Sequence, residues 1–193
     1  MKSNTQQTEP CVAYEWVQTL ICSVLAVVLL FTFVGRVVVV DGESMRETLQ
    51  DHDLVLLLND ALCREYEAQD IIVLSKETFE SGSPIVKRVI ATEGQTVEID
   101  FNAGIVYVDG VMLEEPYTRE PTWTEEGVDF PLTVPENHVF VLGDNRNRSS
   151  DSRHIDLGPI DERMVIGKVF FLAVPGKAAE TGVREWSRVG LIE

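Results

Sequence analysis

Cysteine and histidine are scarce in this chain, with three of each among 193 residues. The cysteines are Cys11, Cys22 and Cys63, and neither a C-x-x-C pair nor an H-E-x-x-H motif occurs. A disulfide framework needs paired cysteines, and a structural zinc site needs clustered thiolate or imidazole ligands. The sequence therefore argues against both, and neither a metal ion nor another cofactor is expected.

Positive charge is also in short supply. Sixteen Lys and Arg residues stand against 32 Asp and Glu residues, which gives a formal net charge of -16. Nucleic-acid binding depends on Lys and Arg side chains that neutralise phosphates, so DNA and RNA are excluded as partners. An acidic surface is also repelled by anionic lipid headgroups, so any attachment to a membrane must be apolar.

One long uncharged segment is present near the N-terminus. Residues 16–35 read WVQTLICSVLAVVLLFTFVG, and as a helix they would span about 30 Å, the thickness of a bilayer's hydrocarbon core. Trp16 and Arg36 are typical of the two interfacial ends. The run is longer than the apolar core of a cleaved signal peptide, and its all-round apolar character disfavours a buried soluble helix. The sequence predicts a short N-terminal segment over 1–15 and a transmembrane helix over 16–36, whose orientation charge alone leaves undecided.

Short β-type runs follow the apolar segment. Asp109-Gly110 supplies the positive φ values of a type I′ hairpin turn, residues 159–164 favour one helical turn, and the polar stretch 114–129 is interpreted as a surface loop. Many short strands with little helix indicate a mainly β fold, with one all-β domain over 37–175 and a peripheral C-terminal tail over 176–193. The predicted strands cover 37–40, 53–58, 71–75, 85–91, 96–100, 105–108, 138–144 and 165–174.

Two residues could carry acid–base chemistry. Ser44 follows a predicted strand and Gly42, and taken alone it is typical of a turn serine. Lys87 lies in IVKRVIA, where neighbouring side chains point to opposite faces. If Arg88 faces water, Lys87 points inward among apolar side chains, where its pKa falls and its amine can act as a base. An exposed Lys87 on an edge strand fits the pattern equally well.

A third segment, GDNRNRSSDSR over 143–153, favours a catalytic interpretation. It combines hydroxyls, turn-forming residues and paired charges directly after the apolar strand HVFVL. Such a loop can orient a lysine amine by hydrogen bonding.

Together, GESMRETL, KRVIATEG and GDNRNRSSDSR resemble the motifs of bacterial type I signal peptidases, in the shorter Gram-positive-like form. The resemblance runs from about residue 15 to about residue 174 and implies a signal-peptidase-like all-β catalytic domain. It implies that Ser44 is the nucleophile, Lys87 the general base and Ser149 the hydroxyl that binds the lysine amine. It further implies that Asp151 and Arg153 form a structural ion pair. By the same resemblance, Met45 lines the substrate-binding region.

The chain departs from the family pattern at two positions. Glu47 stands where the family usually has proline, so the preset φ of proline is lost. Gly42 stands where some members have a serine that donates to the oxyanion, so backbone N–H groups, chiefly that of Ser44, would have to suffice. The resemblance implies cleavage of secretory preproteins after small residues, by a single-pass enzyme of the cytoplasmic membrane with its catalytic domain on the extracytoplasmic side.

Two other functions are open to the sequence. A self-cleaving Ser/Lys repressor has a similar catalytic fold, but it would need an N-terminal DNA-binding domain where this chain has the apolar run. A membrane-tethered β-domain that binds without catalysis is the alternative from a different class. For the signal peptidase that the resemblance implies, the expected partners are secretory preproteins and the lipid bilayer.

Overall fold

The computed structural model describes residues 12–33, 35–63, 65–178 and 181–192. Most of the predicted N-terminal segment, residues 1–11 with Cys11, lies outside the described residues. The chain divides into two compact units, Met1–Gly35 and Arg36–Glu193.

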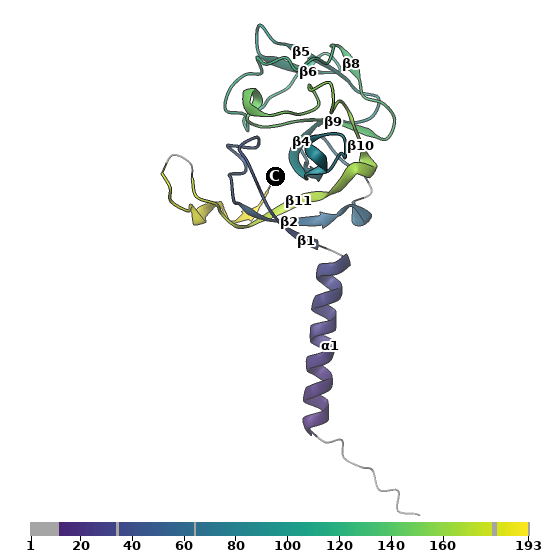
Figure 1. Ribbon diagram of the computed structural model, residues 1–193, viewed down its shortest axis with the longest axis vertical. Coiled ribbons are helices and arrows are strands. Elements are labelled where there is room, and N and C mark those ends of the chain that lie inside the picture. The colour runs from purple at the N-terminus through teal and green to yellow at the C-terminus, as the bar shows by residue number, and fades with distance from the viewer. Residues whose placement is uncertain (1–11, 34, 64, 179–180, 193) are drawn as a thin grey trace, which may run out of the picture. The chain divides into compact units, whose positions relative to one another are not determined.

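The first unit contains one helix, α1, over Val12–Phe33 (Figure 1). Among the described residues, no helix combines the length and the hydropathy that crossing a bilayer requires. The predicted transmembrane helix over 16–36 is therefore not confirmed, and it includes Val34, which the structure does not describe.

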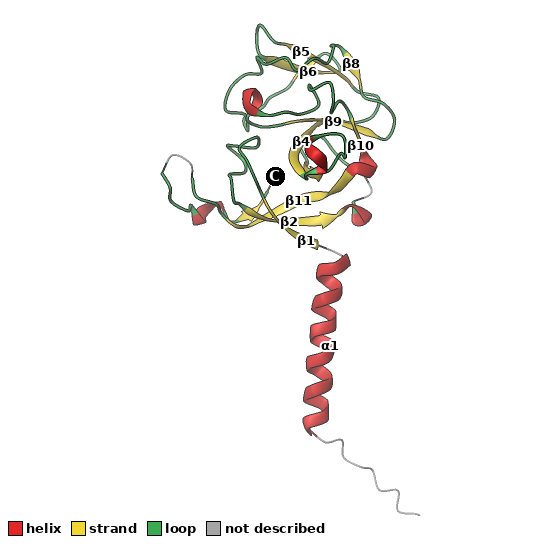
Figure 2. Cartoon of the chain, viewed as in Figure 1, coloured by secondary structure: helices red, strands yellow, loops and turns green. Residues whose placement is uncertain are grey.

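The second unit is built from antiparallel strands in two sheets, with short 3-10 turns as its described helices (Figure 2). Within the described residues, the larger sheet has eight strands in the order β1-β2-β11-β3-β4-β9-β10, and β12 also pairs with β11. The smaller sheet has the order β7-β6-β5-β8. The mainly β prediction is confirmed. The strands are β1 Gly35–Val39, β2 Leu54–Asn59, β3 Ile71–Leu74, β4 Ile85–Ala91, β5 Thr96–Asp100, β6 Ile105–Val108, β7 Val111–Met112, β8 Leu132–Thr133, β9 His138–Leu142, β10 Ile160–Asp161, β11 Val165–Val174 and β12 Gly190–Leu191.

Local sequence signals account for several connections. Asp109 and Gly110 have φ values of 52° and 76° between β6 and β7, as the type I′ turn requires. The predicted helical turn within 159–164 is the 3-10 turn Glu162–Met164, which Asp161 caps by accepting from the Arg163 N–H. The other 3-10 turns are Asp60–Leu62, Glu80–Gly82, Arg146–Arg148 and Trp186–Arg188.

Strand β4 lies among the hydrophobic clusters, and all seven of its residues are buried. Its neighbours are β3, which pairs Ile72 with Lys87, and β9, which pairs Leu142 with Arg88. The condition that Arg88 faces water does not hold, because both faces of this central strand are covered and Arg88 is 1% exposed. The strand therefore places a lysine and an arginine in the interior on opposite faces.

Two segments that were expected at the periphery contribute to the interior. Thr122, within the polar stretch 114–129, is fully buried, and Ala178 in the C-terminal tail is also buried. Strand β12 adds the tail to the larger sheet through the pairs Phe171–Leu191 and Leu172–Gly190.

Candidate active site

Ser44 lies in the connection between β1 and β2. Gly42 adopts a φ of 97°, which turns the chain sharply after β1, and the Gly42 N–H donates to Asp51 Oδ1 at 3.0 Å. The residues after Ser44 then form a helix-like turn, in which the Leu49 N–H donates to the Met45 carbonyl at 2.8 Å. Ser44, at the start of this turn, is half-buried.

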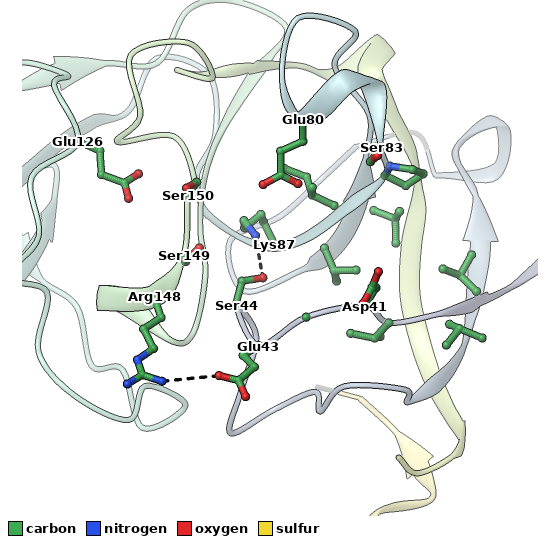
Figure 3. Close-up of a pocket in the computed structure, with 18 of the residues that line it drawn as sticks. Asp41, Glu43, Ser44, Glu80, Ser83, Lys87, Glu126, Arg148, Ser149 and Ser150 are labelled. Carbon is green, nitrogen blue, oxygen red and sulfur yellow. Dashed lines mark hydrogen bonds and ion pairs between the residues drawn. The ribbon is translucent and has the colours of Figure 1, made fainter. Parts of the chain in front are cut away.

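Lys87 approaches Ser44 from β4. Its side chain is 3% exposed, and its Nζ lies 2.8 Å from Ser44 Oγ (Figure 3). The structure therefore brings together the two residues that sequence comparison predicted as nucleophile and base, although 43 positions separate them. It also selects the buried position for Lys87 over the exposed one.

The surroundings of Lys87 favour its neutral form. Burial lowers the pKa of the amine from its ordinary value of 10.5, and the nearby Arg153 guanidinium lowers it further. The carboxylates of Asp151, Glu80 and Glu126 act in the opposite direction, but desolvation is the largest effect. A desolvated lysine with a lowered pKa is a usable general base.

Ser44 and Lys87 open into a cleft of about 890 Å³. Part of its lining is apolar. These residues are Val38 in β1, Val40 just after it, Val73 in β3, and Ile85 and Val86 in β4. Glu126, Arg148, Ser149 and Ser150 lie on the other side of Ser44 from Asp41 and Ser83 (Figure 3). The pair thus belongs to a cleft that has both apolar and polar lining residues.

The loop over 143–153 holds the Ser44 turn through hydrogen bonds to its backbone. The Asn145 N–H donates to the Ser44 carbonyl at 3.0 Å, and Asn145 Nδ2 donates to the Glu43 carbonyl at 3.1 Å. Gly143 permits this approach, because a Cβ at that position would lie 2.6 Å from the Ser44 carbonyl oxygen. The predicted Asp151–Arg153 ion pair is present and fully buried, with Arg153 Nε 2.8 Å from Asp151 Oδ1.

Two predicted supporting roles do not appear in the structure. Ser149 lines the cleft, but its buried hydroxyl has no hydrogen-bond partner among the described residues, so the predicted bond to Lys87 is not formed. Its Oγ is packed against Gly143, 2.1 Å from where a Cβ would be. Met45 does not line the cleft. Met45 is 1% exposed and belongs to a hydrophobic cluster. Its side chain therefore faces the interior, whereas Ser44 lines the cleft.

Sequence reasoning missed a second buried ion pair. Arg88 binds Asp144 with two parallel bonds of 2.9 Å, from Nε to Oδ1 and from Nη2 to Oδ2. The Arg88 guanidinium also lies 4.1 Å from the centre of the Tyr117 ring. Asp144 and Arg88 occur within the recognised motifs and could have been paired from them. Tyr117 lies in a polar stretch whose composition gives no such signal.

A third arginine fixes the polar stretch to the loop. Arg146 Nη2 lies 2.6 Å from Glu115 Oε1, and Arg146 Nη1 donates to Thr122 Oγ1 at 3.0 Å. The stretch 114–129 is therefore attached to the 143–153 loop, and its Glu126 lines the cleft.

An antiparallel β fold with a buried lysine against a serine hydroxyl is typical of serine peptidases that use lysine as their base. Comparisons with known proteins agree. The family described as "Signal peptidase, peptidase S26" matches residues 13–174. Signal peptidase I of Bacillus licheniformis is 34% identical over 170 residues, covering 84% of this chain and 89% of the relative. Probable signal peptidase I-1 of Synechocystis sp. is 36% identical over 179 residues, covering 89% and 83%.

A solved signal peptidase I from Enterococcus faecalis is 32% identical, with a TM-score of 0.45 over 54% of this chain and 97% of that chain. The extent of the family match and the identity of the Bacillus and Synechocystis relatives are decisive. The chain belongs to the signal peptidase family, peptidase S26.

The Ser44 turn contains a strained residue that suggests a stability test. Glu47 is exposed and has a φ of 103°, a conformation that side chains with a Cβ rarely adopt. Glu47→Gly should raise the free energy of unfolding by about 1 kcal/mol, because glycine adopts this φ without strain. Glu47→Pro should lower it by about 3 kcal/mol or more, because proline fixes φ near -65°. Denaturant unfolding of both variants measures the change, and a more stable Glu47→Pro protein would contradict this conformation.

Proposed function

We propose that this chain removes signal peptides from secretory preproteins, with Ser44 as nucleophile and Lys87 as general base within a catalytic domain over 37–175. The observation that carries the proposal is the 2.8 Å contact between Lys87 Nζ and Ser44 Oγ at the floor of a cleft. Membership of the signal peptidase family supplies the substrate class.

The geometry suits acyl transfer. Neutral Lys87 accepts the hydroxyl proton as Ser44 Oγ attacks the scissile carbonyl carbon, and the resulting ammonium then donates this proton to the leaving amine. The acyl-enzyme ester is hydrolysed when Lys87 takes a proton from an attacking water. The bond between Ser44 Oγ and the acyl carbon then breaks, and Lys87 returns the proton to Ser44 Oγ. Burial of Lys87 serves both steps because it lowers the pKa of the amine and so favours the form that accepts a proton.

The oxyanion that forms on the substrate needs hydrogen-bond donors. The backbone N–H of Ser44 makes no hydrogen bond to the described part of the chain, so it is free to donate. A donor of this kind contributes about 3–4 kcal/mol to transition-state stabilisation in comparable sites. Gly42 provides no side-chain hydroxyl for this purpose.

Preference for small residues before the scissile bond follows from the apolar region of the cleft. Val38, Val40 and Val86 line this region, and a small apolar side chain can be buried there without an unsatisfied polar group. An extended peptide with small side chains fits such a lining better than one with charged side chains.

Membrane attachment is the remaining part of the proposal. Residues 16–35 carry no charge, and Ser44 follows Arg36 by only eight positions in the sequence. We propose that 16–36 anchors the chain in the cytoplasmic membrane as a single pass, with the catalytic domain on the extracytoplasmic side.

Substitution of either member of the pair should abolish preprotein cleavage. Ser44→Ala removes the nucleophile and Lys87→Ala removes the base, so each should lower kcat by about a thousand-fold or more. Cleavage of a radiolabelled preprotein by the detergent-solubilised chain measures this.

Ser187→Ala and Lys177→Ala are matched controls, because both residues are exposed and lie outside the Ser44–Lys87 cleft. Their kcat should equal that of the unmutated chain. Full cleavage by Ser44→Ala would contradict the proposal, and absence of cleavage by every form would favour a non-catalytic binding domain.

The pH dependence should report on Lys87. Activity should fall as the pH drops through the pKa of Lys87, because the ammonium cannot accept the serine proton. Glu126→Gln removes a carboxylate that stabilises the ammonium, so the acidic limb of kcat/KM should move to lower pH. Glu125→Gln, at an exposed neighbour outside the cleft lining, should leave the limb unchanged. A shift of the limb to higher pH in Glu126→Gln would contradict the assignment.

The anchor can be tested by alkaline extraction of membranes from cells that express the full chain. The unmutated chain should remain in the pellet. Leu25→Arg with Leu29→Arg should release it, since each arginine near the centre of a span costs about 2.5–3.5 kcal/mol on insertion. Leu25→Ile with Leu29→Ile is the matched control and should stay in the pellet. Release of the unmutated chain would refute the anchor.

A further inference from the structure

A buried carboxylate ends the connection that carries Ser44. Asp53 directly precedes β2 and is fully buried. Its oxygens accept hydrogen bonds from the Gln50 N–H at 2.7 Å and the Gly176 N–H at 2.6 Å. A buried carboxylate also needs a cation, because desolvation of an unpaired charge is costly.

The cation comes from the C-terminal tail. Arg188 Nη2 lies 2.6 Å from Asp53 Oδ2, and Arg188 Nη1 lies 3.1 Å from Asp53 Oδ1. This two-bond pairing is the strong geometry for arginine and carboxylate. Arg188 is 14 positions beyond residue 174, where the family match ends, so the family motifs do not include it.

Arg188 also reaches the backbone of the Ser44 turn. Its Nη2 donates to the Thr48 carbonyl at 3.0 Å. The side-chain hydroxyl of Thr48 donates to Asp144 Oδ2 at 2.5 Å and accepts from Arg88 Nη2 at 3.2 Å. Thr48 is therefore held from two directions, by Arg188 through its carbonyl and by the Arg88–Asp144 pair through its hydroxyl.

The two attachments of Thr48 lie next to a residue with a strained backbone. Thr48 follows the strained Glu47, whose φ is 103°, and its N–H donates to the Met45 carbonyl at 3.1 Å, next to Ser44. A strained backbone persists only where the surrounding structure fixes it on both sides. The Asn145 N–H fixes the Ser44 end, and Arg188 fixes the Thr48 end.

We propose that Arg188 is a positioning residue, which holds the 44–53 connection so that Ser44 Oγ stays within reach of Lys87. The inference rests on the proposed function for its catalytic consequence, and it assigns to the tail over 176–193 a role in the active site. Small displacements of a nucleophile are sufficient to matter, since about 1 Å costs up to about a hundred-fold in rate.

Arg188→Gln in the full detergent-solubilised chain tests the inference with two independent measurements. Amide hydrogen exchange should become at least about ten-fold faster in the 44–53 peptide and stay unchanged in β3 and β4, which separates local release from unfolding. In preprotein cleavage, kcat should fall about ten-fold with KM changed less than about two-fold, because alignment and not substrate binding is lost. Arg188→Lys should restore part of kcat, because the ammonium still pairs with Asp53.

Arg184→Gln is the matched control, an exposed arginine of the same tail whose Nη1 donates to the Pro175 carbonyl at 2.9 Å. It should behave as the unmutated chain in both measurements. If Arg188→Gln does not fold, Asp53→Asn with Arg188→Gln removes the uncompensated charge and should show the same fast exchange and low kcat.

Exchange and kcat at the unmutated level in a folded Arg188→Gln or double variant would overturn the inference. Hydrogen exchange is measured without any substrate, so it tests the positioning role even if the proposed function is wrong. In that case Ser44→Ala would cleave as well as the unmutated chain, and fast exchange in Arg188→Gln would still support the positioning role.

Discussion

The exclusion of water from the Lys87 amine beside the Ser44 hydroxyl is the interaction on which the site depends. The chain carries a net charge of -16, and three nearby carboxylates favour the ammonium, so a lysine at this place in water would stay protonated. Burial prevails because the cost of desolvating a cation exceeds these longer-range attractions. The dry setting requires a strand that is covered on both faces, and β4, the centre of the fold, supplies it.

A buried β4 brings Arg88 into the interior together with Lys87, and the remaining architecture deals with that second charge. Asp144 neutralises Arg88 from the loop that also contacts the Ser44 carbonyl, and Asp151 neutralises Arg153 in the same loop. Removing one partner of such a buried pair costs about 3–5 kcal/mol, because the other charge remains desolvated. The ion pairs therefore do more for the conformation of the serine and its loop than for net stability.

The sequence was sufficient for the longer strands, since alternating and β-branched runs and the Asp109-Gly110 turn depend on local chemistry. It did not predict the two-residue strands β8, β10 and β12, which form through pairing with distant segments. It also identified Ser44 and Lys87 by resemblance. It could not predict that both faces of β4 are buried, because that depends on β3, β9 and the clusters around them. Nor could it predict that Met45 is buried, that the Ser149 hydroxyl turns away from Lys87, or that Arg188 reaches Asp53 across 135 positions, since each depends on tertiary packing.

The central claim is that the folded protein holds the Lys87 amine neutral at a pH where other lysines are charged. An NMR titration of the chain with 13C at lysine Cε measures this directly, with the Lys87 signal assigned by its absence in Lys87→Ala. We expect the Lys87 signal to titrate below the ordinary lysine value of 10.5, because burial lowers the pKa of this amine. A Lys87 signal that titrates together with the surface lysines would contradict the account.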